Sequence, residues 1–269
     1  MTPGSGLRRT ISQHMRLWTF LLLALGSAAS AQEMVRVPQG PFTMGSDDGP
    51  PDERPAHTVT LAAFEIDRLP VTNAEFARFL QQHGPVAPGG QRYFDWDDSD
   101  ARIHRQDGSW RADPGYGDHP VVEPSWLGAQ AYCRWVGKRL PTEAEWEKAA
   151  RSSDGRRYPW GTTAPGPTHA QFRAGFNETA PAGAHPAGAS PYGALDMAGN
   201  VWHWVSSAYR PYPYRGDDGR EDATPGAVRG TRGGGHDSSA AELRTTERGR
   251  NLSRGPAAGH HNIGFRCAR

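Results

Sequence analysis

The spacing of hydrophobic and polar positions predicts three short helices, the first of which follows Thr72. Thr72 and Glu75 have the Thr-x-x-Glu spacing of a capping box, in which each side chain satisfies a backbone N–H group at the start of a helix. Apolar residues then recur three or four positions apart, at Phe76, Phe79 and Leu80. Gly84 ends this pattern, so we predict a helix over residues 72–82.

Two further helices are predicted on either side of a tight turn at Pro141. Ser125 can cap the first of them, whose mostly apolar body continues to Gly137. Thr142 and Glu145 form another capping box, after which apolar residues gather near one face of the second helix. These apolar residues are Ala144, Trp146, Ala149 and Ala150.

Short runs rich in β-branched and aromatic residues predict strands at both ends of the chain. Residues 34–46 and 57–69 are typical of strands separated by turns, and residues 193–204 of a turn followed by a buried strand. Residues 85–124 and 205–227 lack such a pattern and are predicted to be irregular. With 33 glycines, 23 prolines and 9 tryptophans, the sequence predicts a loop-rich α+β fold with a core rather than a disordered chain.

The N-terminal residues have the organisation of a secretory signal peptide. Three arginines precede an apolar run at residues 17–25, and a small-residue pattern, Ala-Ser-Ala, precedes Gln32. An uncleaved membrane anchor is the alternative, but the apolar run is short for a membrane span. We expect cleavage of residues 1–31, a single domain over residues 32–269, a periplasmic or secreted protein, and no stable membrane span. The net charge of +1 gives no electrostatic basis for binding nucleic acid.

Four stretches of the chain carry a resemblance to a known family. KRLPTEAEWEKAAR at residues 138–151 is followed closely by YPWG. The others are FTMGS at 42–46, GALDMAGNVW at 193–202 and GFRCAR at 264–269. In this order they resemble the formylglycine-generating enzyme family, also called the sulfatase-modifying factor family, from residue 34 to the end. The resemblance implies a loop-rich α+β domain of the formylglycine-generating type, related to C-type lectin-like folds.

The chain has two cysteines, Cys133 in the predicted central helix and Cys267 near the end. An even number in an exported chain suggests a disulfide, and two buried free thiols are the alternative. The resemblance implies the same pairing, since family members often join these two positions. We predict the disulfide, which leaves neither cysteine as a catalytic thiol.

The resemblance also locates the positions at which family oxidases bind Cu(I). In those enzymes Arg-x-x-x-Gly-Gly-Ser precedes two cysteines, whose thiolates hold the soft copper ion and activate oxygen there. The corresponding run here begins at Arg229, with Gly235 at the serine position and Ser238 and Leu243 at the cysteine positions. Neither Ser nor Leu binds Cu(I) usefully, so the sequence argues against copper and against thiol-dependent formylglycine generation.

Polar residues surround the positions of the absent cysteines. The candidate pocket comprises His236, Asp237, Ser238, Glu242 and Arg244 and, by resemblance, Arg248 and His261. Such a group suits proton transfer from a substrate, with His236 as candidate base and Asp237 as its orienting partner. We favour an oxidative maturation or modification enzyme without the cysteine pair, similar in this respect to periplasmic pyoverdine-maturation relatives. Its substrate would be an exported protein or a secreted small molecule.

Two other functions stay open at this point. The first is a binding module for a ligand or protein on a retired enzyme scaffold. The second is a non-haem Fe(II) enzyme with a two-His-one-carboxylate face, for example His203, His236 and Asp237. Ergothioneine sulfoxide synthases carry a related domain, but their iron histidines lie largely in another, helical domain. A Ser/His/Asp hydrolase is excluded, because consecutive residues cannot normally form a triad.

The resemblance further implies a structural calcium site near residues 193–204. Its oxygen ligands would come from Asp196 and from the carbonyls of Gly199 and Val201. His203 stands where the family usually has a glutamate, and imidazole is a poor calcium ligand, which argues against this site. The acidic segment at residues 47–54 is predicted to be a solvated loop rather than an ion site.

Overall fold

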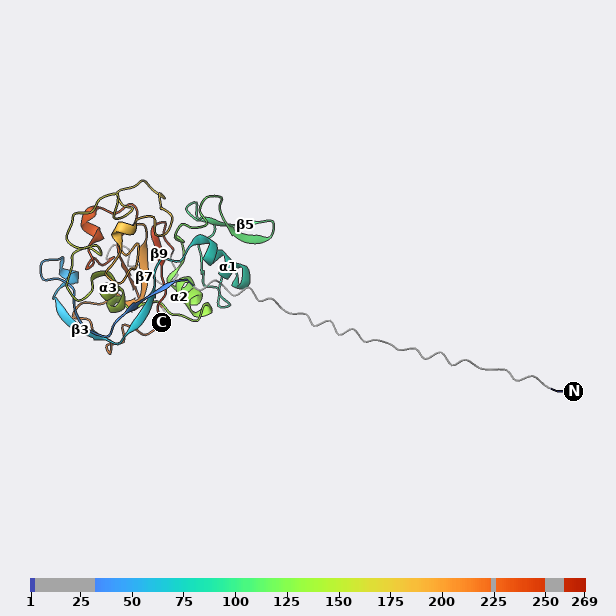
Figure 1. Cartoon of the computed structure of the whole chain (residues 1–269), viewed down its shortest axis with the longest axis horizontal. Helices are drawn as coiled ribbons and strands as arrows, with labels where there is room; N and C mark the ends of the chain where they lie inside the picture. Colours follow the sequence, from blue (N-terminus) through green and yellow to red (C-terminus); the bar gives the residue numbers. More distant parts are fainter. Residues whose placement is uncertain (3–31, 224–225, 250–258) are drawn as a thin grey trace. The chain divides into compact units, whose positions relative to one another are not determined.

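Side-chain caps start each α-helix in the described part of the chain. The computed structural model describes residues 1–2, 32–223, 226–249 and 259–269. Its helices are α1 (Asn73–His83), α2 (Trp126–Trp135) and α3 (Glu143–Arg151) (Figure 1). Thr72 and Thr142 each form a complete capping box, and the Ser125 side chain accepts a hydrogen bond from the backbone N–H of Gly128. All three predicted helix starts are therefore confirmed, because a cap depends on a few adjacent residues.

The strands are short and pair in small sheets. The antiparallel pairs are β1 (Met34–Val37) with β4 (Phe64–Asp67), β2 (Gly40–Met44) with β3 (His57–Leu61), and β5 (Ile103–Gln106) with β6 (Ser109–Ala112). In a three-stranded sheet, β7 (Trp202–Ala208) lies between antiparallel β8 (Arg229–Arg232) and parallel β9 (Ile263–Phe265). Three short 3₁₀ helices complete the elements among the described residues: η1 (Pro51–Glu53), η2 (Pro186–Gly188) and η3 (Ala240–Leu243). The predicted loop-rich α+β class is confirmed.

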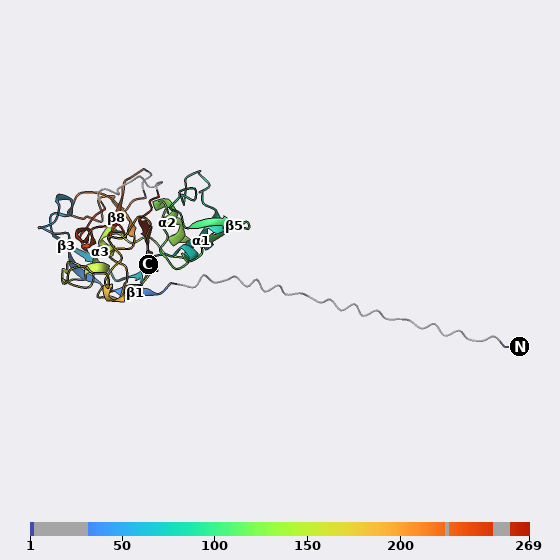
Figure 2. The same ribbon diagram turned by 90° about the horizontal axis from the view of Figure 1, so that it is seen from above.

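Three segments differ from the prediction. The run at residues 57–69 forms two strands with different partners, since β3 pairs with β2 and β4 with β1. Residues 85–124, predicted to be irregular, contain the β5–β6 hairpin, which lies beside α1 (Figure 2). Its four-residue strands are mostly half-buried and leave little periodic signal. The acidic segment at 47–54 is not simply a solvated loop, because Glu53 is fully buried.

The central strand β7 confirms the prediction of a buried strand after residue 193. Trp202 and Trp204 are almost completely buried, and so is Trp126 of α2. The Trp126 indole donates a hydrogen bond of 2.7 Å to the carbonyl of Val205, and the Trp204 indole donates one of 3.0 Å to the carbonyl of Pro124. These bonds fix α2 against β7 and thereby place the loops that follow β7 and β8.

The predicted disulfide is present. Cys133 of α2 and Cys267, which follows β9, are bonded at 2.04 Å and are both fully buried in the main hydrophobic core. The described residues from Gln32 onward group into one compact unit, whereas the predicted signal peptide lies outside the described residues except for its first two. Within the described ranges, no helix has both the length and the apolar character that crossing a bilayer requires.

Candidate functional site

A tight turn after β8 presents the first two candidate residues. The backbone N–H of Ser238 donates to the carbonyl of Gly235 at 3.1 Å, and the backbone N–H of Gly235 donates to the Ser238 hydroxyl at 3.0 Å. His236 and Asp237 occupy the two positions between them. The sequence-predicted pocket residue Ser238 therefore closes the turn that holds the other two.

The glycines before this turn allow it to approach the core. Gly233 and Gly234 both have positive φ, at 103° and 77°. A Cβ atom at Gly234 would lie 2.8 Å from the Leu243 side chain, and one at Gly233 would lie 2.9 Å from the Trp146 ring. A larger residue at either position would have to move the turn or its packed neighbours.

His236 is completely buried and held in one orientation by a backbone carbonyl. The carbonyl of Asn200 accepts hydrogen bonds from both the backbone N–H of His236, at 2.8 Å, and its ring Nδ1, at 3.0 Å. Because a carbonyl oxygen can only accept, the ring proton is on Nδ1 and the lone pair is on Nε2. Nε2 has no hydrogen-bond partner among the described residues. Burial lowers the pKa of His236, so the ring is neutral near pH 7.

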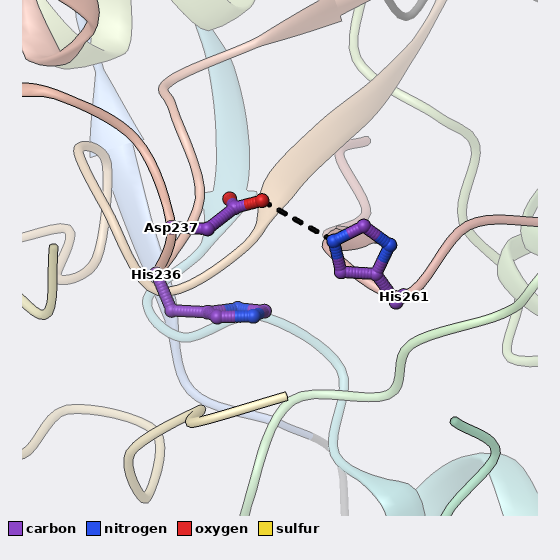
Figure 3. Close-up of side chains that lie close together, drawn as sticks. All are labelled: His236, Asp237 and His261. Atoms are coloured by element: carbon purple, nitrogen blue, oxygen red, sulfur yellow. Dashed lines mark hydrogen bonds and ion pairs between the residues drawn. The ribbon is translucent and has the colours of Figure 1, made fainter. Parts of the chain in front are cut away.

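Asp237 and His261 meet on the more open side of His236 (Figure 3). The Nε2 atom of His261 lies 3.2 Å from Oδ2 of Asp237, and both carboxylate oxygens accept from the Asn262 side-chain amide at 3.0 Å. Partial burial acts to raise the pKa of Asp237, but the hydrogen bonds from His261 and Asn262 outweigh it and lower the pKa to about 2. Asp237 is therefore ionised across the physiological range. The exposed ring of Phe176 packs on His261, with ring centroids 4.3 Å apart.

The predicted relation between His236 and Asp237 is wrong. The orienting partner of His236 is the carbonyl of Asn200, whereas the hydrogen bonds of the Asp237 side chain go to His261 and Asn262. Asn200 and Asn262 were missed by sequence reasoning. Asn262 adjoins a predicted pocket residue, which is a weak signal, but nothing in the local pattern indicates that a main-chain carbonyl at position 200 points at an imidazole.

Three other predicted pocket residues have different partners. The Glu242 side chain accepts from the backbone N–H of Ser239 and caps η3. Arg244 pairs with the buried Glu53, with N–O distances of 2.7 and 2.8 Å. Arg248 is almost completely buried and pairs with Glu143 of α3. These side chains are engaged in the scaffold and do not join the histidine cluster.

A buried network of charges accounts for the position of Arg248. Glu143 accepts hydrogen bonds from Arg248 at 2.7 Å and from Arg232 at 3.0 Å, and Arg232 also pairs with Glu147 at 2.6 Å. Burial acts to raise the pKa of Glu143, but the two guanidinium groups outweigh it and hold the pKa below its ordinary value. Ion pairing likewise raises the pKa of Arg248 although burial opposes it. Two glutamates of the motif at 138–151, Glu143 and Glu147, thus pair with buried arginines of the scaffold.

The residues at the family's copper positions do not fit Cu(I). Leu243 is completely buried in an apolar cluster with Tyr158 and Ala198, and its side chain offers no ligand atom. Ser238 offers only a hydroxyl oxygen, which already accepts a hydrogen bond from Gly235. A soft ion that requires thiolates has no donor set at these positions.

His203 does not belong to the cluster, contrary to the predicted His203–His236–Asp237 iron face. It is fully buried in β7, and its Nδ1 accepts a hydrogen bond from the Trp146 indole at 3.2 Å. His261 takes its place, because one ligand atom each from His236, Asp237 and His261 lies within 4.8 Å of the other two. At the predicted calcium position, Asp196 Oδ2 accepts from the backbone N–H of Gly183 at 2.8 Å, and the calcium site stays a prediction.

Fold and site together define the class of protein. Residues 23–269 match the sulfatase-modifying factor enzyme 1-like domain, and the chain belongs to this family. It is 37% identical to the formylglycine-generating enzyme of Streptomyces coelicolor, with 89% of this chain and 90% of that protein covered. The solved structure of PvdO from Pseudomonas aeruginosa superposes with a TM-score of 0.68 and 29% identity, over 88% of this chain and 94% of that one.

The chain is also similar to parts of longer proteins. It is 39% identical to hercynine oxygenase of Mycolicibacterium smegmatis, with 72% of this chain and 50% of that protein covered. It is likewise 39% identical to serine/threonine-protein kinase Pkn1 of Chlamydia trachomatis, with 88% of this chain and 38% of that protein covered. The chain thus spans half or less of the length of these two relatives.

Proposed function

We propose that this chain is an oxidative modification enzyme that acts without the family's cysteine pair and has its centre at His236, Asp237 and His261. The observation that carries the proposal is Nε2 of His236, a buried lone pair without a partner among the described residues. An unsatisfied buried acceptor costs about 1–3 kcal/mol. A group of this kind calls for a functional explanation, and a reactant or ligand that meets the lone pair supplies one.

The relatives support an oxidative reaction. One of them is named hercynine oxygenase, a name that describes an oxidation by that protein, and another is named formylglycine-generating enzyme. This chain keeps the scaffold and replaces the copper ligands. The rebuilt part contains an ionised carboxylate, a neutral buried imidazole and a second, partly exposed imidazole. These groups accept protons or bind metal ions, and either ability serves oxidation of a bound substrate. The proposed oxidant is dioxygen, which is reduced to hydrogen peroxide when the substrate loses two hydrogens.

The proposed substrate is an exported protein or a secreted small molecule, and the proposed location is the periplasm or the cell exterior. The Cys133–Cys267 disulfide supports this location, because such bonds persist in oxidising compartments. Asp237 and His261 are partly exposed, so a substrate can contact these two side chains from solvent. Phe176, 65% exposed and packed on His261, offers an apolar contact beside the opening.

The test compares the exported products of isogenic strains of the source organism. One strain lacks the gene, and the others carry the wild-type chain, His236→Gln or His104→Gln. His104 is the matched control, because it also pairs with an aspartate, Asp113, but its side chain is 44% exposed and lies on β5, outside the cluster of His236, Asp237 and His261. Untargeted mass spectrometry of exported proteins and secreted metabolites then searches for a species that differs from its precursor by loss of two hydrogens or gain of oxygen.

The expected result is that the oxidised species occurs with wild type and His104→Gln, and that its precursor accumulates with His236→Gln and in the deletion strain. Thermal unfolding of purified His236→Gln establishes that the variant folds. If His236→Gln does not fold, Asp237→Asn is used in its place, because this change affects a more exposed side chain. Identical product profiles in the wild-type and deletion strains, while the protein is produced, would overturn the proposal and favour a ligand-binding module.

A further inference from the structure

We infer that His236, Asp237 and His261 form a binding site for a divalent first-row transition metal ion. The inference concerns the same side chains as the proposed function but does not depend on it. If the chain binds metal but oxidises no substrate, the inferred metal site stands and the proposed function is refuted.

The buried histidine is already set up as a ligand. Neutral imidazole binds metals through an unprotonated ring nitrogen, and the other nitrogen usually donates to a carbonyl or carboxylate that fixes the ring. In His236 the Nδ1–H group donates to the carbonyl of Asn200, which leaves Nε2 as the coordinating atom. Since this atom is buried and has no partner among the residues that the structure describes, a bound ion would remove the cost of leaving it unsatisfied.

The donor set identifies the class of ion. Two imidazoles and one carboxylate suit borderline metals such as Fe(II) and Zn(II), whereas calcium and magnesium prefer oxygen and Cu(I) prefers sulfur. Candidate ligand atoms of the three residues all lie within 4.8 Å of one another. Figure 3 shows the His236 ring edge-on below the Asp237 carboxylate, with the ring of His261 across the gap.

The separation between His261 and Asp237 also fits coordination. Nε2 of His261 and Oδ2 of Asp237 lie 3.2 Å apart, at the long end of the ordinary N–H···O hydrogen-bond range of about 2.7–3.2 Å. Two ligands on one ion with bonds of about 2.1 Å are separated by about 3.0 Å at a right angle and about 3.4 Å at the tetrahedral angle. The same separation therefore fits both the hydrogen bond and two ligands of one ion, for which His261 would give up its Nε2 proton. The three candidate ligand atoms lie within 4.8 Å of one another, and the side chains of Asp237 and His261 are partly exposed.

Neighbouring groups hold the ligands in place. The Asn262 amide donates to both oxygens of Asp237, and the two hydrogen bonds between Gly235 and Ser238 fix the turn that carries two of the ligands. Such outer contacts orient ligands in metal sites, and losing one typically weakens metal affinity about 10–100-fold. The backbone of the site is thus largely preformed.

The exposure of the ligands indicates an open site. His236 is fully buried, while the side chains of Asp237 and His261 are 32% and 16% exposed. An ion held by these three groups would have three protein ligands, and water or substrate could supply further ligands from the side on which Asp237 and His261 are exposed. Three protein ligands with an open position are characteristic of catalytic rather than structural metal sites.

The experiment measures metal binding directly. The chain, purified from an exported form and stripped with a chelator, is titrated with Co(II) and followed by its visible absorption, and with Zn(II) by calorimetry. Four variants are compared with wild type: His236→Gln, Asp237→Asn, His261→Gln and the control His104→Gln. We expect wild type and the control to bind one ion per chain with the same affinity. Each site variant should bind at least ~10-fold more weakly, since losing a ligand costs no less than losing an outer contact.

Two results would overturn the inference. One is the absence of saturable binding of both ions by folded wild type. The other is an affinity that none of the three site variants changes, which would show adventitious surface binding only. His261→Gln keeps the test decisive if the buried His236→Gln fails to fold, because His261 is partly exposed. Product analysis of the same variants is independent, so metal binding without substrate oxidation would refute only the proposed function.

Discussion

Removing the Cys133–Cys267 disulfide should destabilise the protein by about 5 kcal/mol. The bond joins residues 134 positions apart, and in the chain-entropy account a loop of this length restricts the unfolded state by roughly 5 kcal/mol at 25 °C. Measured losses for native disulfides are about 2–5 kcal/mol, and domains of this kind have a total stability of about 5–15 kcal/mol. The disulfide therefore accounts for a third or more of the total free energy of unfolding. Production in a reducing compartment should give poorly folded protein.

The assay is urea unfolding of wild type and of Cys133→Ala/Cys267→Ala, followed by tryptophan fluorescence. The double variant should show a lower midpoint and also a steeper dependence on urea, because an unconstrained unfolded chain exposes more surface. Wild type unfolded in the presence of a reductant lacks the disulfide but keeps both sulfur atoms. The difference between its free energy of unfolding and that of the double variant therefore measures how much the packing of the two sulfur atoms contributes. A double variant within about 1 kcal/mol of wild type would refute the entropic argument, since the predicted effect is several times larger.

Two further predictions concern the buried charges. Arg248→Met should lower the free energy of unfolding by about 3 kcal/mol, because the Glu143 carboxylate then keeps, among the described residues, only its bond to Arg232. Combining the change with Glu143→Gln should cost less than the sum of the two single changes. Wild-type stability in Arg248→Met would contradict a stabilising role of the Glu143–Arg248 pair. The second prediction concerns pH. The pKa of Glu143 is held below its ordinary value of 4.5, so its contribution to stability is present above pH 4.5 and is lost as the pH falls through the folded-state pKa. The stability difference between wild type and Glu143→Gln, measured by urea unfolding at several pH values, should therefore shrink on acidification, and a constant difference would contradict the assigned shift.

Local features of the fold were determined by the sequence alone. A helix start depends on residues three positions apart, so Thr72 with Glu75 and Thr142 with Glu145 were sufficient to predict two capping boxes. The buried strand β7 was visible as an apolar run after a turn. The absence of the copper-binding thiols is a property of the sequence itself, since no residue elsewhere can turn Ser238 or Leu243 into a thiolate.

The composition of the site was decided by tertiary structure. Arg244 and Arg248 lie close to His236 in sequence, but buried glutamates far along the chain, Glu53 and Glu143, pair with them. The cost of burying an unpaired charge determines where these side chains go, and sequence spacing contains no information about a partner more than a hundred residues away. His261 joined the cluster in place of His203 for a similar reason. His203 faces Trp146 within the core, while the loop before β9 brings His261 to Asp237.

The protonation of His236 is the clearest case of what the sequence could not supply. A histidine in a loop is as consistent with a solvated side chain as with a ligand or base. Only the folded chain places the carbonyl of Asn200 at Nδ1 and leaves Nε2 buried without a partner among the described residues. Main-chain carbonyl directions depend on backbone dihedrals in irregular loops, and Asn200 has a positive φ of 66° that no periodic pattern encodes. The sequence thus determined the scaffold and the loss of the old chemistry, and the folded structure determined which side chains form the site.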